Sequence, residues 1–227
     1  MEPNVCTCKP GASKQFSTSK KNVLVIGDSI SIGWTPWAAK NLSDVALVQH
    51  SPWDVRDGGA EEAAYGKQCL EFFLSSPGGR ALTPDLVVFN WGMHDGPMSN
   101  ATVPGQNGPS SQYPVDLADI ARRLAIWAAT GERAERETKL LFVLTTPFVC
   151  SINATGNVLA LNNVAREIMD DANIPVFDPF PAIVDRCSPL PNPTCDGIDD
   201  CWCPHCPAQW GWLAEMIVPT MRTMLLA

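Results

Sequence analysis

The chain has 227 residues, 45% of them hydrophobic and 18% charged, which is typical of one globular domain with a substantial core. Its 16 basic and 24 acidic residues give a formal net charge of −8, which repels phosphate backbones and argues against nucleic acid as a partner. No run of about 18 apolar residues is present, so we expect no integral membrane segment.

The chain alternates between short apolar runs and segments with helical spacing. Residues 1–20 predict an irregular arm, anchored by Cys6 or Cys8, and residues 21–227 predict one domain. Strands are expected at 23–26, 45–48, 86–89, 140–144 and 175–177, and helices at 60–74, 114–130, 156–172 and 208–226. This order favours a parallel sheet covered by helices on both faces. The polar stretch 98–113 predicts a surface loop at the carboxyl edge of the sheet, where ligands bind in such folds.

The first predicted strand runs directly into the sequence GDSISIG at 27–33. A serine at a strand-to-helix turn has its hydroxyl at the carboxyl edge of the sheet and its N–H near a helix N-terminus, where developing negative charge is stabilised. Ser29 is therefore a candidate nucleophile. The alternative is that Asp28 or Ser29 only caps the following helix.

Three blocks in register resemble the SGNH (GDSL-type) hydrolase superfamily. GDSISIG is similar to its first block, FNWGMHD at 89–95 stands where the family carries G-x-N-D, and His205 stands where the family carries D-x-x-H. The resemblance covers about residues 22–226. It implies a serine hydrolase with Ser29 as nucleophile and His205 as base, without metal or organic cofactor. The expected fold is a flavodoxin-like, three-layer α/β/α sandwich with strand order 2-1-3-4-5.

The expected oxyanion hole combines backbone and side-chain donors. The resemblance implies the Ser29 N–H and a glycine N–H from the family's second block, here Gly58 or Gly59, although either could be a simple turn glycine. His94 stands at the position of the family's asparagine, as in a subgroup with a GLHD-like third block. A neutral imidazole can donate one hydrogen bond there, and the alternative is a structural histidine.

The last block departs from the family because Trp202 stands three residues before His205, where an aspartate is usual. The base needs a partner on its second nitrogen to hold the productive tautomer. Asp200 is the first choice for this role and Asp199 the second. The alternative is a Ser–His dyad oriented by a backbone carbonyl.

Nine cysteines indicate disulfides formed in an oxidising compartment. Sequons at Asn41, Asn100 and Asn153 agree with a secreted glycoprotein, although residues 1–20 contain no signal segment. A zinc site in the last loop is the alternative, but the spacing C-x-C-x-x-C fits it poorly, so disulfides are favoured. Six cysteines fall in Pro-rich or Gly-rich stretches: Cys6, Cys8, Cys187, Cys195, Cys201 and Cys206.

Several of the eight tryptophans fall after strand ends or beside the blocks, where aromatic walls can stack on sugars or enclose acyl chains. The alternative for each of them is core packing. His50, after the second strand, is expected to be structural. The predicted substrate-binding set is Asp28, Trp34, Trp53, Asn90 and Trp91.

The sequence thus predicts a serine esterase that hydrolyses carboxylic esters through an acyl-enzyme. Small acyl groups, including acetyl groups on carbohydrates, are the first choice of substrate. The alternatives are a lipase or long-acyl esterase, an acyltransferase on the same site, and a non-catalytic ligand-binding protein of the same fold.

Overall fold

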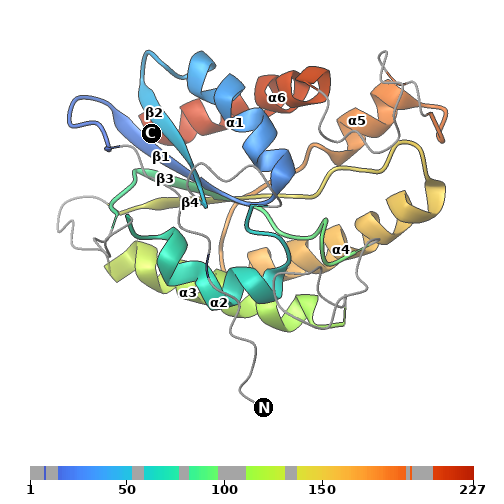
Figure 1. The fold of residues 1–227 in the computed structure, drawn as a ribbon, viewed down its shortest axis with the longest axis horizontal. Coiled ribbons are helices and arrows are strands. Elements are labelled where there is room, and N and C mark those ends of the chain that lie inside the picture. The colour runs from blue at the N-terminus through green and yellow to red at the C-terminus, as the bar shows by residue number, and fades with distance from the viewer. Residues whose placement is uncertain are drawn as a thin grey trace.

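The computed structural model describes residues 8, 15–52, 59–76, 82–96, 111–130, 137–192, 195 and 207–227. These residues form a three-layer α/β/α sandwich around a five-stranded parallel sheet (Figure 1). The strands lie in the order β2-β1-β3-β4-β5, which confirms the predicted fold class and strand order. Their bounds are β1 (Lys21–Ile26), β2 (Ala46–Ser51), β3 (Leu86–Phe89), β4 (Lys139–Val143) and β5 (Val176–Phe177).

The helices divide between the two faces of the sheet (Figure 1). α1 (Ser29–Asn41) and α6 (Pro207–Leu226) cover one face, whereas α2 (Ala63–Phe73), α3 (Tyr113–Thr130) and α4 (Ile152–Asp171) cover the other. Alternate residues of each strand point to opposite faces, so each strand must be apolar on both sides. In β1, Val23 and Val25 pack on the α1 and α6 side, and Leu24 and Ile26 pack on the other.

The strand register brings several strand ends to one edge of the sheet. Ile26 is paired with Ser51 of β2 and with Phe89 of β3, and Phe89 is paired with Phe142 of β4. The first three are the last residues of their strands. The loops that follow β1, β2 and β3 therefore leave the sheet side by side.

Two helices differ from the expectation. α5 (Phe180–Cys187) was not predicted, because eight residues show too few turns to display a helical period, and their apolar side chains pack on the α1 side. α4 begins at Ile152 instead of residue 156, because the Ser151 side chain caps it by accepting a hydrogen bond from the Ala154 N–H at 3.2 Å. The predicted loop 98–113 lies mostly outside the described residues.

Two disulfides join described residues: Cys8–Cys69 and Cys187–Cys195. They confirm cross-links at three of the six cysteines singled out above, whereas Cys69, buried within α2, was not expected to take part. The first bond ties Cys8 to α2. Among the helices that the structure describes, none is both long enough and apolar enough to cross a bilayer.

Candidate active site

Ser29 is the first residue of α1, three residues beyond the end of β1, and its side chain is half-buried. The preceding residue caps the helix, because Asp28 Oδ1 accepts a hydrogen bond from the Ile30 N–H at 2.9 Å. The helix N-terminus adds partial positive charge around the Ser29 N–H. Asp28 therefore caps α1, and the role of Ser29 as nucleophile stays a prediction.

Gly59 lies directly against this turn. It forms an antiparallel bridge with Asp28, and the adjacent Ala60 N–H donates to the Gly27 carbonyl at 2.8 Å. Its φ of +65° is in the left-handed region, and a Cβ at this position would lie 2.4 Å from Gly27 O. Only glycine combines this backbone conformation with such a close approach. The loop after β2 therefore meets the candidate nucleophile at Gly59.

The loop after β3 is locked to the loop after β2 by Trp91. Its side chain is fully buried, and its indole N–H donates to Ala60 O at 3.2 Å. The indole ring packs over Gly66 of α2, where a Cβ would lie 2.4 Å from the ring. Tyr113 of α3 donates its hydroxyl proton to Trp91 O at 2.9 Å. These contacts give Trp91 a structural role.

Asp95 ends the same block and holds the start of α2. Both of its carboxylate oxygens lie near the Ala63 N–H, at 3.1 and 3.0 Å. The pKa of Asp95 is raised to about 8, mainly by burial and to a smaller extent by the nearby carboxylates of Glu62 and Asp116, against the effect of the Ala63 hydrogen bond. The sequence offered no signal for this role, since the start of α2 is 32 residues away.

The predicted substrate-binding residues in the described part are mostly enclosed. Asp28, Trp34 and Trp91 are 1%, 3% and 0% exposed. Asn90 is also buried and donates its side-chain amide to Val143 O at 2.7 Å, joining the ends of β3 and β4. Direct contact of these four residues with a substrate stays a prediction.

His94 is half-buried in the turn after β3, beside Asp95. His205, Asp199, Asp200, Gly58 and Trp53 lie outside the described residues, so their roles stay predictions. Described residues flank the segment of the proposed base: Cys195, which is bonded to Cys187, precedes it, and α6 follows from residue 207. That disulfide also removes Cys195 from the set of free zinc-ligand thiols.

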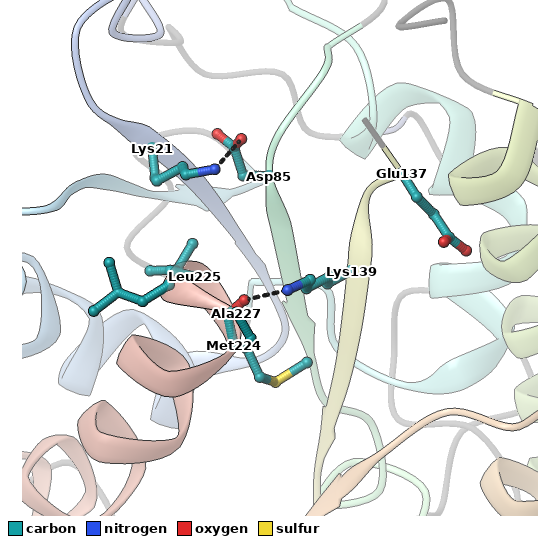
Figure 2. Close-up of a pocket in the computed structure, with 8 residues that line it drawn as sticks. Lys21, Asp85, Glu137, Lys139, Met224, Leu225 and Ala227 are labelled. Carbon is teal, nitrogen blue, oxygen red and sulfur yellow. Dashed lines mark hydrogen bonds and ion pairs between the residues drawn. The ribbon is translucent and has the colours of Figure 1, made fainter. Parts of the chain in front are cut away.

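A cavity of about 480 Å³ lies at the opposite edge of the sheet (Figure 2). It is lined by residues at or near the amino ends of β1, β3 and β4, together with the end of α6. Three of its charged groups have partners: Lys21 lies 3.5 Å from Asp85, and Lys139 donates to Met224 O at 2.7 Å (Figure 2). This cavity is separate from the candidate active site, because Ser29 follows the carboxyl end of β1.

No family model matches this sequence, and no curated protein matches it. Solved structures do match. An acetyl xylan esterase is 14% identical, with a TM-score of 0.61 over 88% of this chain and 98% of the other. A variant of an acetyl-xylooligosaccharide esterase from Geobacillus stearothermophilus is 14% identical, with a TM-score of 0.60 over 92% and 96%.

A lipase/acylhydrolase from Enterococcus faecalis is also 14% identical, with a TM-score of 0.57 over 89% of this chain and 96% of the other. Another matching structure is described as a lipolytic protein of the G-D-S-L family. Together with the strand order, these similarities show that the chain has the α/β fold of the SGNH (GDSL-type) hydrolases.

Gly59→Ala should destabilise the protein by about 2 kcal/mol or more, because the new methyl group meets Gly27 O and the backbone conformation is unfavourable for alanine. Urea unfolding measures the change. Gly156→Ala is the matched control: its Cβ would meet nothing within 4 Å inside α4, so we expect about 0.5–1 kcal/mol of stabilisation. Equal stability of Gly59→Ala and the unmodified protein would contradict the close approach.

Asp95→Asn should flatten the pH dependence of stability. The native state keeps the Asp95 proton up to about pH 8, whereas an unfolded chain releases it near its ordinary value of 3.8. The stabilisation is therefore complete below about pH 4 and is lost as the pH rises through 8. Between pH 5 and 8 this group should lower the free energy of unfolding by on the order of 1 kcal/mol per pH unit.

Urea unfolding of both proteins across this pH range measures the difference between their slopes. Asp170→Asn, which removes an exposed carboxylate at the end of α4, is the control and should leave the slope unchanged. Parallel curves for Asp95→Asn and the unmodified protein would show that Asp95 is ionised in the folded state.

Proposed function

We propose that this protein is a serine esterase that hydrolyses carboxylic esters through an acyl-enzyme on Ser29. The observation that carries the proposal is the position of Ser29 at the first residue of α1, with capping assigned to Asp28. The resemblance of the three sequence blocks to SGNH hydrolases and the shared fold support the same chemistry. The proposed catalytic domain spans residues 21–227.

In the proposed mechanism His205 takes the proton of the Ser29 hydroxyl as Oγ attacks the ester carbonyl carbon. The N–H groups of Ser29 and of Gly58 or Gly59, with His94, stabilise the oxyanion. His205 then protonates the departing alcohol, and a water molecule, deprotonated by the same imidazole, releases the acid from Ser29. Asp200, or else Asp199, orients His205.

We further propose small acyl groups, with acetyl groups on carbohydrates first among them. Two structural neighbours are described as esterases of acetylated xylan or its oligosaccharides, and a third, from Sinorhizobium meliloti, as a carbohydrate acetylesterase. The Enterococcus faecalis neighbour, a lipase/acylhydrolase, supports the long-acyl alternative. A small-molecule ester, or an acylated carbohydrate or lipid, is thus the proposed partner.

A secreted or secretory-pathway location is proposed with this activity. The disulfides Cys8–Cys69 and Cys187–Cys195 support it because such bonds persist in oxidising compartments. The sequon residues Asn41 and Asn153 are exposed, as carriers of N-glycans must be.

A fluorophosphonate probe tests the nucleophile without knowledge of the substrate. We expect one covalent adduct, located on Ser29 by peptide mass spectrometry, because only an activated serine reacts with the probe. Ser29→Ala and His205→Ala should each abolish it, whereas Ser43→Ala, in the exposed turn after α1, should not. A folded protein without any adduct would refute the esterase and favour a ligand-binding role.

Hydrolysis of nitrophenyl esters tests the acyl preference. We expect kcat/KM to be at least about tenfold higher for the acetyl ester than for acyl chains of eight carbons or more, since a site shaped for small groups cannot enclose a long chain. Release of acetate from acetylated xylo-oligosaccharides extends the test to carbohydrates. Cleavage of the long chains alone would establish the lipase alternative.

A further inference from the structure

His50 joins the edge strand of the sheet to the turn that carries Ser29. It is the penultimate residue of β2, and its side chain lies on the face covered by α1. Its Nε2 is 2.7 Å from the hydroxyl of Ser31 in the first turn of α1, and this hydroxyl donates to Asp28 O at 2.7 Å. Two consecutive short contacts, from His50 to Ser31 and from Ser31 to Asp28 O, therefore connect β2 with the carbonyl that precedes Ser29.

The direction of the hydrogen bonds follows from a count of protons. Asp28 O can only accept, so the single hydroxyl proton of Ser31 must point toward Asp28 O. His50 Nε2 must then carry the proton of its own contact with Ser31. Burial lowers the pKa of His50 to about 4, so at neutral pH the ring has one N–H only. Nδ1 has no proton in this tautomer and only faces Pro52 O at 3.4 Å, so a long contact with Pro52 is given up in favour of the 2.7 Å contact with Ser31.

The acceptor of this relay shares a rigid plane with the proposed oxyanion donor. In a trans peptide the C=O and the following N–H point in opposite directions, so fixing Asp28 C=O also fixes the Ser29 N–H. Asp28 O accepts a second bond from the Ile32 N–H at 3.1 Å, which occupies both lone pairs of the oxygen. Hydrogen bonds to a peptide oxygen also polarise its N–H and make it a stronger donor.

We propose that Ser31 and His50 are positioning residues, which aim and polarise the Ser29 N–H for an oxyanion through the relay His50 N–H to Ser31 O–H to Asp28 C=O. The inference rests on the proposed esterase function and adds two residues to its machinery. Neither touches the reacting atoms.

The residues around the relay keep water out and leave space for the Ser31 hydroxyl. Ser31 is 1% exposed, so water cannot replace its hydroxyl. A Cβ on Gly27 would lie 2.7 Å from Ser31 Oγ, so only glycine leaves room for the hydroxyl at this place. From the other side, Gly59 bridges to Asp28. The peptide before Ser29 is thus held by two independent sets of contacts.

Steady-state ester hydrolysis and the rate of fluorophosphonate labelling test the relay in four variants. Ser31→Ala and His50→Leu should each lower kcat and the labelling rate by about ten- to a hundredfold with KM little changed, because a misdirected oxyanion donor affects mainly the transition state. His50→Gln keeps an N–H donor and should restore most of kcat. The double variant Ser31→Ala/His50→Leu should be no slower than Ser31→Ala, because His50 acts through Ser31.

Ser51→Ala is the matched control. Ser51 is the next residue of β2 and is fully buried, but its hydroxyl donates to Phe73 O at 3.1 Å on the other face of the sheet. We expect it to lower the unfolding midpoint and to leave kcat of the folded enzyme unchanged. Circular dichroism verifies folding of every variant before its rates are compared.

The outcomes separate this inference from the function on which it rests. An unmodified protein that neither hydrolyses esters nor takes up the probe refutes the esterase. An active protein in which folded Ser31→Ala or His50→Leu keeps its kcat refutes the relay alone. The relay is also refuted if Ser51→Ala loses as much kcat as Ser31→Ala, since the loss then follows from destabilised packing.

Discussion

The parallel pairing of β1 with β2 on one side and with β3 on the other is the constraint on which the rest of the structure depends. Ile26 is in register with Ser51 and Phe89, so three strands end at the same level. The loops that follow these three strands therefore leave the sheet next to one another. Residues 29, 59 and 91 are brought together by this register, although helices and long loops separate them in the chain.

Buried polar bonds then hold these loops in one arrangement. Trp91 donates to Ala60 O, Asp95 caps α2, and the Asn162 side chain exchanges two hydrogen bonds with the backbone of Thr145, at 2.9 and 2.8 Å, just beyond β4. A buried polar group without a partner is costly, so alternative loop positions that break these bonds are disfavoured. The apolar layers supply most of the stability, and the polar bonds select one geometry at the carboxyl edge.

The sequence was sufficient for the sheet and for the position of Ser29 at the start of a helix, because both depend on local signals. β1 and β3 are short runs that are buried on two faces, and Ser29, the proposed nucleophile, follows β1 after Gly27 and Asp28. The roles of His50 and Asp95 could not be predicted. His50 depends on a partner 19 residues away on another element, and Asp95 depends on the start of a helix 32 residues upstream. Contacts over such separations in the chain leave no trace in the strand period of two residues or the helix period of 3.6 residues, which are the patterns a sequence displays.

The short helix α5 and the role of Cys69 escaped prediction for related reasons. Eight residues give only two helical turns, and one cysteine gives no indication of its partner. Trp34 and Trp91 were predicted to contact substrate from their position beside a motif, and that contact stays a prediction. Their burial shows that both also pack in the interior.

The third block gives the relay a particular importance in the proposed site. An asparagine amide offers two N–H donors, whereas an imidazole with one N–H offers a single donor. In the proposed site the backbone N–H groups of Ser29 and of Gly58 or Gly59 therefore act beside one side-chain donor. A backbone N–H stabilises an oxyanion well only when its peptide plane is held in the right orientation. Here Ser31 and Ile32 hold the plane before Ser29, and Gly59 adjoins it from the loop after β2. In the proposed site, the hydrogen bonds that fix the peptide plane before Ser29 and the single N–H donor of His94 therefore serve the same oxyanion, one from the main chain and one from a side chain.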